Sequence, residues 1–147
     1  MKEALKEAKK AYRIGEIPVG AVIVLDDKII ARGYNKREGK QSVLSHAEIE
    51  AIKKAEKKIG SWRLEEAKLY VTLEPCPMCA GAIIQSRIKE VYYGASDPKT
   101  GAVGSVLNLF DYKFNHQVIY QGGILALECQ DLITSFFKEL RINKKKM

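Results

Sequence analysis

The chain has no hydrophobic run that approaches membrane-spanning length, and its first residues, Met1 to Tyr12, contain no continuous apolar stretch of signal-peptide length. We therefore expect a soluble, cytoplasmic protein with no membrane partner. Cysteine is scarce too, with three residues in 147. An odd number, with Cys76 and Cys79 so close in sequence, argues against the disulfide framework of a small secreted domain and favours metal or redox chemistry for that pair.

The chain also lacks internal repeats, linkers and low-complexity segments, so we expect a single domain over residues 1–147. Its charge is unbalanced, because 25 Lys and Arg residues face 18 Asp and Glu residues and give a net charge of +7. Residues 138–147 hold five basic residues and one acidic residue, and so carry +4 of that excess. This basic tail indicates a polyanionic partner, although a solvated helix end has the same composition.

The hydrophobic pattern predicts strands that alternate with helices. Helices, marked by apolar residues three or four positions apart and by capping residues, are expected over residues 2–14, 46–59, from Cys76 onward, and 124–141. Strands, rich in β-branched residues, are expected over residues 19–25, 28–34, 69–73, 91–95 and 118–120, with loops over 35–42 and 97–105. Asp26 and Asp27 suit the tight turn of a hairpin between the first two strands. The alternation predicts an α/β fold with helices on both faces of a sheet.

Three ordinary zinc ligands, His46, Cys76 and Cys79, stand at two of the predicted helix starts. Cys76 and Cys79 share one face of a first helical turn, where unpaired backbone N–H groups favour a thiolate. A structural zinc site closes with a fourth Cys or His, whereas one His and two Cys leave a position for water. The sequence therefore predicts one catalytic Zn²⁺ per subunit, held by His46, Cys76 and Cys79.

Glu48, two residues after His46, is the predicted catalytic residue. Two thiolates cancel the formal charge of Zn²⁺, so the attacking water needs a further group to take its proton, and Glu48 is placed to do so. As an alternative, Ser45 and Glu48 have the spacing of a helix capping box, in which Glu48 is structural. Cys-x-x-Cys alone also fits a redox pair or half of a zinc ribbon, but neither explains His46 and Glu48.

Cys129 and His116 offer a competing arrangement. Together with the three predicted ligands they could close a structural zinc site, which would leave no position for water. Cys129 lies among apolar positions of the last predicted helix, so we expect a small buried hydrophobe there instead.

The pattern His46-Ala47-Glu48 followed by Pro75-Cys76-Pro77-Met78-Cys79 is a deaminase signature. With the stretch Lys99 to Ser105, it makes the chain similar to the bacterial tRNA adenosine deaminases of the cytidine deaminase superfamily, over nearly its whole length. The resemblance implies a three-layer α/β/α sandwich around a mixed five-stranded sheet, and a homodimer. It also implies a substrate, the wobble adenosine of an arginine tRNA, splayed from the anticodon stem-loop into a pocket over the zinc and converted to inosine.

The same resemblance implies which residues contact the substrate. Asn35 matches a residue that contacts the inserted nucleoside, the loop after Asp97 matches one beside the anticodon, and the last helix matches one that lies along the RNA. The expected substrate-binding and RNA-binding residues are Val19, Asn35, Ala47, Asp97, Lys99, Phe136, Phe137 and Arg141. Two alternatives stay open: a deaminase of a free base or nucleotide, of the guanine or cytosine type, and a non-catalytic zinc-stabilised RNA-binding module.

Overall fold

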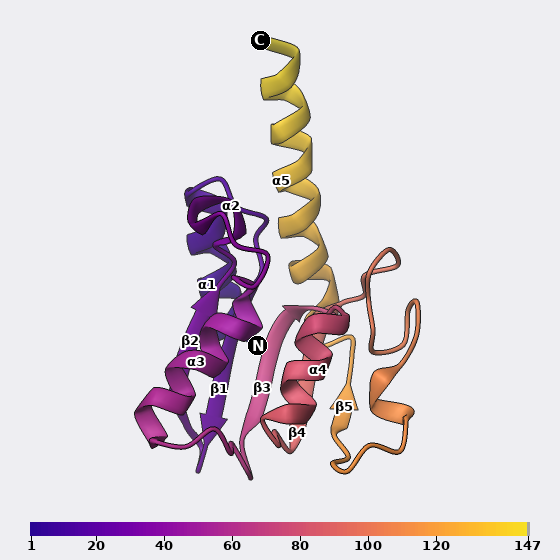
Figure 1. Ribbon diagram of the computed structural model, residues 1–147. Coiled ribbons are helices and arrows are strands. Elements are labelled where there is room, and N and C mark those ends of the chain that lie inside the picture. Colours follow the sequence, from indigo (N-terminus) through magenta and orange to yellow (C-terminus); the bar gives the residue numbers. More distant parts are fainter. Residues whose placement is uncertain (147) are drawn as a thin grey trace.

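A single mixed sheet of five strands lies between two layers of helices in the computed structural model, which describes residues 1–146 (Figure 1). The strands are β1 (Gly20–Leu25), β2 (Lys28–Tyr34), β3 (Lys68–Leu73), β4 (Glu90–Ala95) and β5 (Ile119–Gln121). Their order is β2-β1-β3-β4-β5; β1 runs antiparallel to β2 and β3, while β3, β4 and β5 are parallel. The predicted α/β/α sandwich is confirmed.

Helices α1 (Lys2–Arg13) and α5 (Ala126–Lys146) cover one face of the sheet, and α3 (Ala47–Ile59) and α4 (Pro77–Gln85) cover the other (Figure 1). Two glycines permit this close packing. A Cβ on Gly20 would collide with the backbone of α1, and a Cβ on Gly33 would lie 2.5 Å from the Ala47 carbonyl oxygen in α3. Of the helices in residues 1–146, none combines the length and apolar character that crossing a bilayer requires.

The β1–β2 hairpin turns where the sequence predicts. Asp26 and Asp27 have φ values of 51° and 62°, and Leu25 pairs with Lys28. Positive φ at both central residues defines a turn whose twist matches that of the flanking strands, and Asp tolerates this conformation better than most residues. The hairpin brings the start of β1 and the end of β2 to one edge of the sheet.

The predicted loop over residues 35–42 is wrong in its middle, because α2 (Arg37–Lys40) forms there. This short helix is held by acceptors outside it. The Asn35 side-chain oxygen accepts from the Arg37 N–H at 3.1 Å, and the Glu16 carboxylate accepts from the N–H groups of residues 38 and 39 at 3.0 and 2.6 Å. Glu16 lies more than twenty positions away, so the local pattern gave no sign of the helix.

The capping box at Ser45 is not formed. Helix α3 has His46 as its N-cap residue, with no side-chain capping bond, so Ser45 precedes the helix and Glu48 is its second residue.

The last helix begins at Ala126, later than the predicted residue 124, and runs on to Lys146. One further element, the 3₁₀ turn η1 (Leu109–Asp111), lies in a segment where no element was predicted. Met147, the end of the predicted basic tail, lies outside the described residues.

The carboxyl ends of β3 and β4 lie side by side, since the two strands are parallel and Leu73 is in register with Ala95. The Glu74 N–H extends this pairing by donating to the Ala95 carbonyl at 2.8 Å. The chain that leaves β3 leads directly to Cys76, and the chain that leaves β4 leads to Asp97. The same edge of the sheet therefore carries both segments and positions the site.

Candidate active site

Three side chains with metal-binding atoms meet at the beginnings of α3 and α4. His46 is the N-cap residue of α3, Cys76 is that of α4, and Cys79 lies in the first turn of α4. Pro77 takes the first helical position, where its missing N–H costs nothing. The His46 Nδ1 atom lies 3.6 Å from the Cys76 sulfur and 3.5 Å from the Cys79 sulfur. The structure thus brings together the three residues that the sequence predicts as ligands.

These separations fit a tetrahedral zinc ion. Zn–N bonds of about 2.0–2.1 Å and Zn–S bonds of about 2.3 Å at tetrahedral angles require N···S distances of about 3.6 Å. The two observed distances, 3.5 and 3.6 Å, agree with that value. A histidine nitrogen so close to both sulfurs is not a requirement of a simple redox pair, so the geometry favours a metal centre.

Cys129 and His116 do not join this group. In residues 1–146 the one cluster of His, Cys, Asp or Glu side chains whose ligand atoms all lie within 4.8 Å of one another is His46, Cys76 and Cys79. Cys129 is buried on α5, across the sheet from α4, with its sulfur against Gly94. His116 contacts the carbonyl oxygen of Ile88 through its Nε2 atom at 2.7 Å. The alternative of a four-ligand structural site is therefore wrong.

Hydrogen bonding among the three side chains favours charge on one sulfur. A hydrogen bond from the Cys79 thiol, with help from His46, lowers the pKa of Cys76 to about 4 although burial opposes this. The same contact with Cys76, together with burial, raises the pKa of the Cys79 thiol. The hydrogen bond to Cys76 also raises the pKa of His46. Cys76 is thus ready to act as a thiolate ligand at neutral pH.

Glu48 is buried beside these residues and lines the same cavity as His46 and Cys76. Burial raises the pKa of its carboxyl to about 7, and the neighbouring Cys76 adds to this effect. A carboxyl group that titrates near neutral pH can both accept and return a proton under physiological conditions. This position and pKa are what a proton-transferring residue requires.

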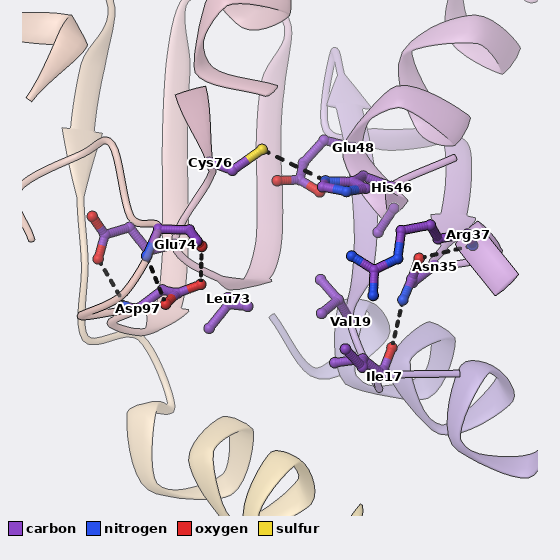
Figure 2. Close-up of a pocket in the computed structure, with 12 residues that line it drawn as sticks. Ile17, Val19, Asn35, Arg37, His46, Glu48, Leu73, Glu74, Cys76 and Asp97 are labelled. Atoms are coloured by element: carbon purple, nitrogen blue, oxygen red, sulfur yellow. Dashed lines mark hydrogen bonds between the residues drawn. The ribbon is translucent and has the colours of Figure 1, made fainter. Parts of the chain in front are cut away.

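The cavity beside His46 and Cys76 has a volume of about 150 Å³. Figure 2 shows Glu48, His46 and Cys76 at its centre, with Asn35 and Arg37 on one wall and Glu74 and Asp97 on the other. The view also shows that the walls come from segments far apart in the sequence. The cavity has room for a flat ring system, while anything attached to that ring must remain at its mouth.

Three of the predicted substrate contacts, Val19, Asn35 and Ala47, line this cavity. Asn35 is fixed in place by its own hydrogen bonds, since its Nδ2 donates to the Ile17 carbonyl at 3.2 Å and its Oδ1 accepts from the Arg37 N–H. One N–H of the amide is thus used by the protein and the other is left for a ligand. The roles of all three residues stay predictions.

Asp97 lines the opposite wall, but its carboxylate is turned to its own loop. It accepts from the N–H groups of Lys99 and Thr100 at 3.1 and 3.2 Å and from the Thr100 hydroxyl at 2.7 Å. Thr100 also lines the cavity, whereas Lys99 is exposed beside it. The predicted RNA contacts of Asp97 and Lys99 therefore involve a loop whose shape Asp97 itself maintains.

Glu74 fastens this loop to the rest of the protein. Its side chain, 2% exposed, accepts hydrogen bonds from the N–H groups of Asp97, Val103 and Ser105, each at 3.0 Å, and from the Ser105 hydroxyl at 2.5 Å. Burial disfavours its charge, but the four hydrogen bonds outweigh burial and hold the pKa of Glu74 below its usual value. The wall of the cavity formed by residues 97–105 is thus anchored at several points.

The three predicted contacts on α5 differ in exposure. Phe136 is 8% exposed, and its ring packs edge-on against the ring of Tyr12 in α1, with 5.6 Å between the ring centroids. Phe136 is therefore part of the packing between the two helices. Phe137 is 36% exposed, and Arg141 is exposed in the C-terminal half of α5. Figure 1 shows the C-terminal end of this helix extending beyond the sheet. Phe137 and Arg141 are accessible to a partner, whereas Phe136 packs against the rings of Tyr12 and Phe137.

The two charged residues of the cavity wall that the sequence analysis missed are Arg37 and Glu74. Each has a signal that could have found it, since Arg37 follows the predicted contact Asn35 by two positions and Glu74 precedes the ligand Cys76 by two. Composition gives neither residue a role, and the residues that Glu74 anchors lie 23 to 31 positions away in the sequence.

The chain matches the MafB19-like deaminase family over residues 1–141. It is 53% identical over 146 residues to the tRNA-specific adenosine deaminase of Bacillus subtilis (strain 168), a match that covers 99% of this chain and 91% of that relative. It is 50% identical over 147 residues to the tRNA-specific adenosine deaminase of Haemophilus influenzae, with 99% and 85% covered.

Solved structures give a consistent result. A structure from work on A-to-I editing by tRNA:A34 deaminases at the wobble position of transfer RNA superimposes with a TM-score of 0.87 at 44% identity, covering 90% of this chain and 96% of that one. The guanine deaminase from Bacillus subtilis superimposes with a TM-score of 0.62 at 33% identity, covering 78% and 83%. Similarity to the first structure exceeds similarity to the second in both measures.

Proposed function

We propose that this chain, which belongs to the MafB19-like deaminases and to the family of the tRNA-specific adenosine deaminases, deaminates adenosine to inosine at the wobble position of a tRNA, that of arginine in particular. The observation that carries the proposal is the convergence of a His-Cys-Cys group and a buried carboxyl, Glu48, on one cavity. The names of its relatives supply the substrate.

The donor set of the site suits zinc. We assign His46, Cys76 and Cys79 as its ligands, one ion per chain, because their atoms have the separations that tetrahedral coordination requires. When bound, zinc would supply a water activated for attack on C6 of adenine. The metal and its ligand set are proposals that metal analysis of the purified protein tests.

Glu48 moves the protons of the reaction. It takes a proton from the attacking water and delivers it to adenine N1 as the C6–O bond forms. It then takes the second proton of the former water and gives it to the amino group, which leaves as ammonia when the C6–N bond breaks. Without this proton the amine is a very poor leaving group, and a well-placed proton donor contributes ~10²- to 10⁴-fold to the rate. The pKa of about 7 suits both directions of transfer.

The remaining assignments concern binding. The cavity of about 150 Å³ accommodates a base that has been splayed out of the anticodon loop, with Val19, Asn35 and Ala47 around it. Lys99, Phe137 and Arg141 are assigned to the RNA outside the cavity, and Asp97, which lines the cavity wall, is assigned to the RNA as well. A homodimer and a cytoplasmic location, where tRNA is found, stay predictions.

The deciding experiment uses anticodon stem-loops with adenosine, cytidine or guanosine at the wobble position, each incubated with the zinc-loaded protein. We expect inosine and ammonia from the adenosine stem-loop alone. Free guanine and free cytosine are assayed in parallel, because the similarity to guanine deaminase keeps free-base deamination as the second candidate. Product from a free base but not from RNA overturns the proposal, and no product from any substrate leaves only a zinc-stabilised RNA-binding module.

The role of Glu48 has its own test. Glu48→Gln keeps the shape of the side chain but cannot accept a proton, so turnover should fall by at least ~10²-fold. Its zinc content should stay near wild type, and it should unfold at a temperature no lower than wild type. Glu56→Gln, on the same helix but away from the cavity, is the matched control and should retain activity. His46→Ala should lose zinc as well as turnover. Turnover of Glu48→Gln near that of wild type would end the assignment.

A further inference from the structure

Arg37 places a positive charge at the cavity. Among residues 1–146 it is the one Lys or Arg side chain that lines this cavity, and Figure 2 shows its guanidinium extending from the Asn35 wall into the space near His46. The side chain is 44% exposed, so it lies at the mouth of the cavity and not at its base. A cation in this position needs an explanation, because adenine is neutral.

The protein uses little of the hydrogen-bonding capacity of this guanidinium. The ion pair of Arg37 within residues 1–146 is with the adjacent Glu38 at 3.6 Å, and Glu38 is itself 68% exposed. Such surface pairs contribute little, because water and salt screen them. A guanidinium has five N–H donors, so most of them are available to a ligand.

The backbone beneath Arg37 is held firmly. Its N–H donates to Asn35, and the next two N–H groups of α2 donate to the buried carboxylate of Glu16. The arginine therefore projects from a fixed segment toward the cavity mouth, while its charge remains available. This combination is typical of a residue that recognises a ligand, because the backbone that carries the side chain loses no further entropy on binding.

The chemistry of the ligand follows from the position. When the base occupies the cavity beside Glu48, the ribose and the flanking phosphates must lie at its mouth, where the guanidinium is. Arginine binds phosphate oxygens through two parallel N–H···O bonds. On the facing wall the Asp97 carboxylate is already engaged by its own loop and does not compete for the guanidinium.

We propose that Arg37 binds a backbone phosphate next to the inserted nucleotide and so selects adenosine within RNA over a free base or nucleoside. This inference rests on the proposed function and extends it. It makes Arg37 a specificity-determining residue, whose contribution is to binding and not to proton transfer.

Binding of RNA as a function of salt tests the inference. All variants carry Glu48→Gln, so that an anticodon stem-loop with wobble adenosine is bound but not converted, and Kd is measured by fluorescence anisotropy over a series of salt concentrations. Arg37→Met should weaken binding about tenfold and reduce the slope of log Kd against log salt by about 0.7–0.9, the loss of one phosphate contact. Arg37→Lys keeps the charge, so it should retain the salt dependence of the Arg37 protein but only part of its affinity for the stem-loop. Lys58→Met, which removes an exposed charge at the far end of α3, is the matched control.

A chemical change in the RNA identifies the phosphate. Each of the two phosphates that flank the wobble adenosine is replaced in turn by a neutral methylphosphonate. One replacement should weaken binding to the arginine-containing protein about tenfold and have no further effect on Arg37→Met, because the same contact is then already missing. Equal losses in both proteins, or a slope that Arg37→Met leaves unchanged, overturn the inference. Failure of the wild-type protein to make inosine overturns the proposed function instead, whatever the Arg37 variants do.

Discussion

Replacing Glu74 by Gln tests whether the anchored loop stabilises the fold. The two carboxylate oxygens accept four hydrogen bonds, and each oxygen receives two of them. A glutamine amide in place of Oε2 would face the N–H groups of Val103 and Ser105. In place of Oε1 it would face the N–H of Asp97, while the Ser105 hydroxyl could turn and accept from it. The second orientation is therefore the less costly one.

The magnitude follows from the bonds that change. In that orientation one hydrogen bond to a charged acceptor is lost, at about 1.5–3 kcal/mol, and the part-buried N–H of Asp97 has no protein partner. Two other N–H groups then donate to a neutral oxygen in place of a charged one, which weakens each by about 0.5–1 kcal/mol. The free energy of unfolding should fall by on the order of 3 kcal/mol.

Urea unfolding of the zinc-loaded protein measures this loss. Glu66→Gln, which removes an exposed carboxylate, should change the free energy of unfolding by less than about 0.5 kcal/mol and serves as the control. Ser105→Ala removes only the hydroxyl bond and should cost about 1 kcal/mol. If Glu74→Gln costs no more than Ser105→Ala, the three backbone N–H bonds do not contribute as argued. The KM for the stem-loop should also rise as the cavity wall loosens.

Three further outcomes can be measured on single variants. Because the pKa of Glu48 is raised to about 7, the chelator-treated wild-type protein should lose stability as pH rises from about 4.5 through about 7. The variant Glu48→Gln should have the same free energy of unfolding as wild type near pH 4.5. At pH 8 it should be about 3 kcal/mol more stable than wild type. Cys129→Ala should still bind one zinc per chain by metal analysis, and its free energy of unfolding should fall by about 1 kcal/mol. Loss of zinc in this variant would instead show that Cys129 is a ligand. Phe136→Ala should lose about 3 kcal/mol in urea unfolding, but Phe137→Ala should lose under 1 kcal/mol and instead weaken stem-loop binding.

Features determined by neighbouring residues were predicted well from the sequence. The Asp26-Asp27 turn, the placement of His46, Cys76 and Cys79 at two helix starts, and the order of strands and helices depend on short patterns of polarity and on residue types with strong local preferences. Cys76 and Cys79 share a helical turn whatever the rest of the chain does. For this reason the candidate ligands could be named from the sequence, although the distance between the two helix starts could not be predicted.

Features that depend on distant partners could not be predicted. Helix α2 exists because Glu16 accepts its N–H groups across 22 and 23 positions of sequence, and the wall of residues 97–105 is held by Glu74 across as many as 31. The Ser45 capping box failed for a related reason. The Ser45 carbonyl accepts from the Lys36 N–H in the neighbouring segment, and the helix begins one residue later than the local pattern suggests.

Because β3 and β4 are parallel neighbours, two separate segments of chain contribute to the site, one after each strand. Two of the three proposed metal ligands, Cys76 and Cys79, follow β3, and the wall formed by residues 97–105 follows β4. A new loop after β4 could therefore change which base is accepted and leave the proposed ligands in place. Glu74 limits this freedom. Any transplanted loop must present N–H groups to the Glu74 carboxylate. This one buried acid therefore limits which loops can be used to change the substrate.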